Sequence, residues 1–99
     1  MKAEVYLEDD PGFRFALLDG LTIGREADID VSRLPENKFV SRVHATFVKE
    51  GSGWSIRDEK STNRTYVNSV ALDPGEKKKL KDGDLISLGY MCFMYTEKP

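Results

Sequence analysis

The sequence predicts an all-β domain, either a sandwich of two sheets or a small barrel. Apolar and polar residues alternate over short runs, and Gly, Pro, Asn and Asp interrupt the chain at short intervals. Helical periodicity is hard to find. A chain of 99 residues is too short for two ordinary hydrophobic cores. We therefore expect a single domain over residues 1–99, with its core from about residue 5 to residue 95.

Several short segments combine alternation with β-branched or aromatic residues, and each is expected to form a strand. They are Glu4–Glu8, Phe13–Leu18, Leu21–Ile23, Val43–Lys49, Trp54–Asp58, Thr65–Val67, Leu85–Leu88 and Met91–Thr96. Val43, Ala45 and Phe47 should face one side of their strand, and His44 and Thr46 the other. Among the large apolar residues, the following are expected in the core: Phe47, Trp54, Ile56 and Phe93.

Between these segments, clusters of Asp, Pro and Gly predict turns at residues 9–12, 19–20, 50–53, 73–75 and 82–84. Two longer stretches, residues 25–41 and 59–64, do not fit a strand. Long loops on a rigid β scaffold are the usual place for a binding site. The lysine cluster at residues 77–79 is predicted to be a solvated turn and edge strand.

Composition and charge exclude several classes of protein. The 15 basic and 17 acidic residues give a net charge of −2, whereas a nucleic-acid binder usually has a basic excess. No apolar run is long enough to span a membrane. The single cysteine, Cys92, excludes an internal disulfide and fits a cytoplasmic protein, and its apolar neighbours predict a buried thiol. Asp28, Asp30 and Glu36 do not match the spacing of a calcium loop, and we expect no metal and no cofactor.

Three polar groups lie at the ends of predicted strands: Gly24-Arg25, Ser41–His44 and Ser61–Thr65. If these strand ends share one rim, the groups bring together guanidinium, hydroxyl and amide donors. Guanidinium can engage two phosphate oxygens, hydroxyls donate without bulk, and an asparagine amide can bond an extended peptide backbone. The pattern therefore favours a phosphate-binding site.

In this order, these groups resemble the forkhead-associated (FHA) domain family. The closing segment Asp82–Gly89 fits as well, so the resemblance extends from about Val5 to Tyr95. It implies a sandwich of two twisted antiparallel sheets whose loops at one end bind phosphothreonine peptides. Catalysis is not implied. The expected partner is a phosphothreonine-containing protein or peptide, such as a Ser/Thr-kinase substrate or another part of its own chain.

The resemblance also implies roles for individual residues. Arg25 would pair with the phosphate and Ser41 would donate to it, while Arg42 would add a phosphate or backbone contact. Thr62 would line the phosphothreonine pocket or reach a phosphate oxygen. Asn63 would hydrogen-bond the peptide backbone beside the phosphothreonine.

Other positions would shape or extend the site. The resemblance gives Gly24 and His44 a supporting role, and Asn68 would pin the turn after Val67. Phe39 lies in the loop that often sets the preference three residues after the phosphothreonine, which suggests an apolar preference there.

The chain departs from the family pattern at two positions. Arg64 stands where the family commonly has Gly, so the turn is either reshaped or gains positive charge at the rim of the site. Ser69 also replaces a frequent Gly, although Asn68 before it tolerates left-handed geometry.

Two other functions are weighed against phosphothreonine binding. Arg64 is the one hint of a phospho-independent interaction or assembly module. A hydrolytic triad of Ser41, His44 and Asp58 is conceivable, but no G-x-S-x-G elbow is present, and Ser41 and His44 are too close in sequence. We therefore expect a signalling module that is not an enzyme.

Overall fold

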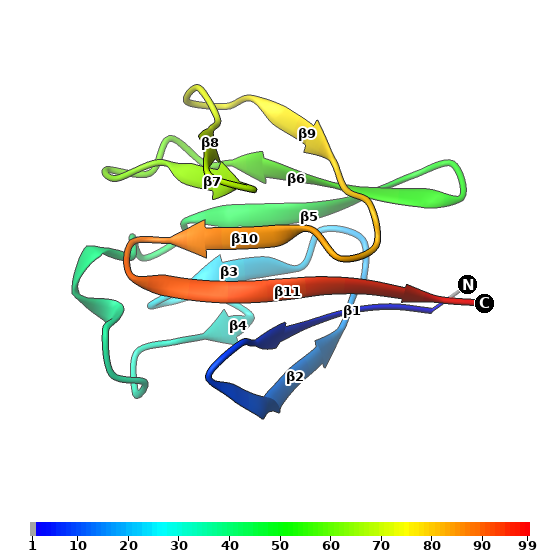
Figure 1. The fold of residues 1–99 in the computed structure, drawn as a ribbon. Coiled ribbons are helices and arrows are strands. Elements are labelled where there is room, and N and C mark those ends of the chain that lie inside the picture. The colour runs from blue at the N-terminus through cyan, green and yellow to red at the C-terminus, as the bar shows by residue number, and fades with distance from the viewer. Residues whose placement is uncertain (1) are drawn as a thin grey trace.

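The computed structural model describes residues 2–99 as two β-sheets packed face to face (Figure 1). One sheet has the strand order β2-β1-β11-β10-β7-β8, and the other has the order β4-β3-β5-β6-β9. The strands of the first sheet are β1 (Lys2–Leu7), β2 (Asp10–Ala16), β7 (Thr65–Val67), β8 (Val70–Ala71), β10 (Leu85–Leu88) and β11 (Met91–Lys98). Those of the second are β3 (Thr22–Gly24), β4 (Ile29–Asp30), β5 (Ala45–Glu50), β6 (Gly53–Asp58) and β9 (Lys77–Lys79). The predicted all-β sandwich is confirmed.

The predicted strands are present, and β7 and β10 have the predicted bounds. Strands β4 and β8 and the short 3₁₀ helix η1 (Asn37–Phe39) were not predicted. A strand of two residues contains no alternation to detect. Strand β4 pairs with β3 in parallel, with Ile23 opposite Ile29, so this one pair departs from the antiparallel pattern.

The lysine cluster forms the edge strand β9, as predicted. Its residues are exposed and pair with β6 on one side, and Lys77 bonds Glu50 across the sheet. The turn predicted at residues 9–12 was wrong in its bounds, because Asp10 already belongs to β2. Pro11 is tolerated in this strand since β2 is at the edge of its sheet, where a missing N–H breaks no ladder.

The core lies between the two sheets and contains the four apolar residues expected there, Phe47, Trp54, Ile56 and Phe93. Val43 does not share this environment. It is 42% exposed because β5 begins only at Ala45, so the alternation ends before it reaches Val43. The expectation for Cys92 was also wrong in degree, since its thiol is only half-buried.

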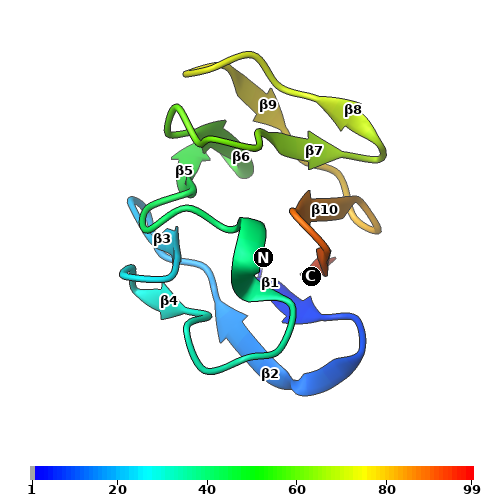
Figure 2. The ribbon, with the colours of Figure 1, turned by 90° about the vertical axis from the view of Figure 1, so that its left-hand side faces the viewer.

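The two ends of the sandwich differ. Both described termini lie at one end (Figure 1). The β10–β11 turn, the β6–β7 loop and the long segment between β4 and β5 gather at the other end, where η1 crosses the face seen in Figure 2. The two stretches that do not fit a strand pattern, residues 25–41 and 59–64, therefore meet at one end of a rigid scaffold.

The turn between β7 and β8 gives a stability prediction. Asn68 and Ser69 both have positive φ, 49° and 70°, which is the geometry of a two-residue hairpin turn that favours Asn-Gly. We expect Ser69→Gly to raise the free energy of unfolding by about 0.5–1 kcal/mol, because glycine adopts left-handed backbone without a Cβ clash. Urea unfolding would measure it. Ser52→Gly, in another hairpin turn but at negative φ, is the matched control and should not stabilise the domain. An equal increase in the free energy of unfolding for both variants would show that the positive φ of Ser69 is not the cause.

Candidate functional site

The site begins where β3 ends at Gly24. Two hydrogen bonds join the next residues to the segment before β5: Arg25 N–H donates to the Ser41 carbonyl at 3.1 Å, and Glu26 N–H to the Arg42 carbonyl at 2.8 Å. This approach leaves no room at Gly24, where a Cβ would lie 2.2 Å from the Arg42 carbonyl oxygen. Glycine therefore allows the first and second polar groups to lie side by side.

Arg25, Ser41, Arg42, Val43 and Thr62 line a surface hollow of about 400 Å³. Arg25 Nε donates to the Val40 carbonyl at 2.6 Å, which fixes the direction of the guanidinium. Within residues 2–99 neither arginine forms a salt bridge, and no carboxylate lines the hollow. The hollow thus combines two cations with two hydroxyl groups and has no anion of its own.

Ser41 connects the two loops that form this hollow. Its Oγ accepts a hydrogen bond from the Thr62 N–H at 3.1 Å, and its own N–H donates to His44 Nδ1 at 3.0 Å. The Ser41 hydroxyl hydrogen has no acceptor among the residues that the structure describes. It is therefore available to a ligand.

His44 is fully buried behind the hollow, at 0% exposure. Because Nδ1 accepts from Ser41 N–H, the ring proton lies on Nε2, which donates to the Arg64 carbonyl at 2.9 Å. Burial lowers the pKa of the imidazole below its usual value, against smaller opposing effects of the Arg64 bond and of Asp58. A neutral His44 thus joins the segment before β5 to the β6–β7 loop.

The arrangement does not form the triad that was weighed in the sequence. The contact between Ser41 and His44 uses the serine backbone N–H and not its hydroxyl. Asp58 accepts hydrogen bonds from Ser61 and Thr65 instead of from the imidazole. Ser41, His44 and Asp58 thus make separate contacts, and their side chains are not joined into a triad.

The burial of His44 predicts a pH-dependent stability. The unfolded chain binds a proton at this residue more readily than the folded chain, so the free energy of unfolding should fall as the pH drops below about 6.5. Urea unfolding without ligand from pH 7.5 to pH 5 measures the effect. His44 is the one histidine of the chain, so His44→Gln should flatten the profile in this range. An equally steep profile in that variant would contradict the assignment.

Asn63 lies beside the first hollow, and its Nδ2 donates to the Phe39 carbonyl at 3.1 Å. Phe39 packs edge-on against Tyr90, with ring centroids 5.1 Å apart. These residues, with Tyr66 and Gly89, line a second, more open hollow of about 430 Å³. The two tyrosines were not predicted as site residues; the sequence signal for Tyr90 was its place directly after the turn glycine Gly89.

Arg64 has a φ of 66°, so the turn keeps the left-handed geometry that usually favours glycine. Its guanidinium donates to the Leu72 carbonyl at 2.9 Å and pairs with Asp73 at 3.0 Å. Arg64 is not among the residues that line either hollow. Its role at the rim therefore stays a prediction.

Asn68 is held at the turn between β7 and β8. Its Nδ2 donates to Asp84 and its Oδ1 accepts from the Leu85 N–H, both at 2.9 Å. These bonds connect the turn to β10, which fits the supporting role expected for Asn68.

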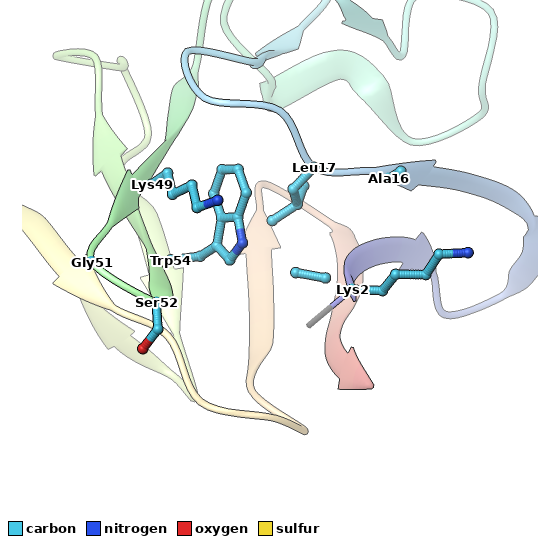
Figure 3. Close-up of a pocket in the computed structure, with 8 residues that line it drawn as sticks. Lys2, Ala16, Leu17, Lys49, Gly51, Ser52 and Trp54 are labelled. Carbon is cyan, nitrogen blue, oxygen red and sulfur yellow. The ribbon is translucent and has the colours of Figure 1, made fainter. Parts of the chain in front are cut away.

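A further hollow, of about 350 Å³, lies at the end of the sandwich that bears the termini (Figure 3). Trp54, Leu17 and Lys49 border it, and it contains none of the residues predicted for the site. Within residues 2–99 no group of His, Cys, Asp and Glu side chains is placed to hold a metal ion. The same residues include no helix long and apolar enough to cross a membrane.

Comparison with known protein families shows to which family the chain belongs. The family model of the FHA domain matches residues 21–89, which include every polar group of the site. This chain belongs to the FHA domain family. The expected family membership is therefore confirmed.

The FHA domain is similar to known proteins in both sequence and fold. Protein FraH of Nostoc sp. is 47% identical over 62 residues, which cover 63% of this chain but 22% of FraH. A solved structure described for phosphothreonine-dependent FHA domain interactions has a TM-score of 0.85 and 30% identity, covering 100% of this chain and 99% of that one. The crystal structure of the FhaA FHA domain with the intracellular domain of Rv3910 has a TM-score of 0.79 and 31% identity, covering 94% and 98%.

Proposed function

We propose that this FHA domain binds a phosphothreonine-containing segment of a protein in cytoplasmic Ser/Thr-kinase signalling, without catalysing a reaction. The observation that supports this most is the hollow formed by Arg25, Ser41, Arg42 and Thr62, which has cations and hydroxyls but no carboxylate. A phosphoryl group has a charge of about −1.5 to −2 and three acceptor oxygens. Two or three charge-assisted hydrogen bonds of about 1.5–3 kcal/mol each are sufficient for micromolar affinity.

The similar structures support the same proposal. One is described for phosphothreonine-dependent interactions, and the other contains an FHA domain in complex with the intracellular domain of another protein. Here the partner would be a kinase substrate or a phosphorylated part of the same polypeptide.

A preference for phosphothreonine over phosphoserine needs an apolar contact for the γ-methyl group. Thr62, which the resemblance places in the phosphothreonine pocket, lines the hollow. The half-exposed Val43 also lines the hollow and adds an apolar surface beside the two arginines. We expect the methyl group to contact this side of the hollow.

Calorimetric titration with one peptide in its phosphothreonine, phosphoserine and unphosphorylated forms tests the proposal. We expect the phosphothreonine peptide to bind more tightly than the phosphoserine peptide, and the unphosphorylated peptide to show no measurable binding. Phosphatase treatment of a captured partner distinguishes this function from the alternative one. A phospho-independent assembly module would retain its partner after the treatment, whereas a phosphothreonine-binding domain would release it. Retention after treatment, or equal affinity for all three peptides, would overturn the proposal.

Phe39 is expected to favour an apolar residue three positions after the phosphothreonine. Its ring packs against Tyr90 and lines the hollow next to Asn63. In an oriented phosphothreonine peptide library, Phe39→Lys should shift the selected residue at this position from apolar to acidic. Phe39→Leu, which retains an apolar side chain, is the control. An unchanged profile in the lysine variant would remove Phe39 from the specificity site.

A further inference from the structure

A smaller hollow of about 200 Å³ lies next to the Phe39–Tyr90 pair. Tyr90 lines both this hollow and the one that contains Phe39 and Asn63. Leu34, Pro35 and Met91 form apolar walls beside it. A segment that passes over Phe39 and Tyr90 would therefore reach this hollow next.

The remaining side of this hollow is acidic. Asp9 and Asp10, from the β1–β2 turn and the start of β2, and Glu36, which precedes η1, all line it. The three side chains are exposed, and no hydrogen bond or salt bridge joins any of them to the rest of residues 2–99. No lysine or arginine lines the hollow. These carboxylates are thus free to pair with a cation from outside.

The binding end therefore changes charge across its width. Arg25 and Arg42 form the cationic side, the aromatic pair lies between with Lys38 Nζ 5.6 Å from the Phe39 ring centroid, and the carboxylates form the acidic side. Opposite charges at the two sides favour one orientation of a bound segment, with its phosphate on the arginines and a basic residue at the far side.

We propose that the acidic hollow binds a lysine or arginine of the phosphorylated partner, at least four residues after the phosphothreonine; this inference rests on the proposed function. The position follows from Phe39, which is expected beside the third residue after the phosphothreonine. An aliphatic stem would lie on Leu34 and Met91 while its charge stays among the carboxylates in water. Tyr90, 68% exposed, offers a ring face for a cation–π contact.

The test uses phosphothreonine peptides with leucine at the third position after the phosphothreonine and alanine elsewhere. A lysine is moved through the fourth to seventh positions, and in matched control peptides it stands equally far before the phosphothreonine. An exposed ion pair with a cation–π contact is expected to raise affinity about three- to tenfold at one or two neighbouring positions. The control peptides should show no such gain.

Variants of the domain locate the effect. Glu36→Gln, and separately the double variant Asp9→Asn with Asp10→Asn, should remove most of the gain from lysine while leaving the alanine peptide bound. Glu26→Gln is the matched control, because Glu26 is exposed near the arginines but does not line the acidic hollow. If Glu26→Gln removes the gain equally, the overall charge of the domain explains it and the inference is overturned.

Two further outcomes also overturn the inference. If the phosphopeptides bind with the same affinity at every position of the lysine, the hollow binds no basic residue, while the proposed function stands. If norleucine in place of the lysine raises the affinity equally, the hollow is an apolar pocket instead of a cation site. If no phosphopeptide binds at all, the proposed function fails, and this inference fails with it.

Discussion

Replacing Arg25 by alanine should weaken binding of a phosphothreonine peptide by about 100-fold or more. The guanidinium is directed by the bond from its Nε to the Val40 carbonyl, and it lines the hollow with no competing carboxylate. Loss of two charge-assisted hydrogen bonds, at about 1.5–3 kcal/mol each, accounts for this factor. Isothermal titration calorimetry at fixed ionic strength gives the ratio of the two affinities.

Two variants separate this effect from a loss of general charge. Arg33→Ala removes an exposed arginine that does not line the hollow, and it should change the affinity less than about threefold. Arg25→Lys retains the charge but not the planar pair of donors. We therefore expect it to reduce the peptide affinity by less than Arg25→Ala and by more than Arg33→Ala. Equal losses for Arg25→Ala and Arg33→Ala would show that the phosphate does not bind at this guanidinium.

Gly24→Ala should reduce the free energy of unfolding by about 3 kcal/mol and weaken peptide binding as well. A Cβ at this position would meet the Arg42 carbonyl oxygen at 2.2 Å and the Ser41 carbonyl oxygen at 2.8 Å. Both are backbone atoms, so no side-chain rotation relieves the contact. The segment that positions Ser41 and Arg42 must move away from β3.

Gly12→Ala is the matched control for this prediction. Gly12 lies in the edge strand β2, where the nearest atom to a new Cβ is a flexible Asp10 oxygen at 3.5 Å. Chemical denaturation should show little change for this variant. A Gly24→Ala domain as stable as Gly12→Ala, with unaltered peptide affinity, would contradict the close approach described for β3.

Much of the fold followed from local patterns in the sequence. Strands β7 and β10 had the predicted bounds because alternation and flanking turn residues define both ends. The sequence also placed Arg25, Ser41 and Thr62 at strand ends, but only the structure shows that these ends share one rim and line one hollow. The resemblance to FHA domains added an expected role for each of these residues.

Other features depend on contacts between residues far apart in sequence. The two-residue strand β4 exists through its pairing with β3, and no local pattern shows it. Tyr90 became part of the candidate site only when the β10–β11 turn came to lie against Phe39. Likewise, Asp9 and Glu36 lie around one hollow because two separate loops meet there.

The effect of Arg64 at a position where the family commonly has glycine depends on contacts far away in the sequence. Its positive φ keeps the turn that glycine usually makes, and its side chain is held by Leu72 and Asp73. The bond from His44 to its carbonyl also fixes this turn. In this chain the left-handed turn at Arg64 is thus held by three hydrogen bonds, two from its side chain and one to its carbonyl.

The most direct test is an NMR titration of the ¹⁵N-labelled domain with one peptide in phosphothreonine and unphosphorylated forms. We predict that the phosphopeptide shifts the backbone amides of residues 25, 41, 42, 62 and 63 most, and that the unphosphorylated peptide shifts none of them. The indole signal of Trp54, at the opposite end, should not move. Equal shifts with both peptides, or the largest shifts around Trp54, would contradict the account.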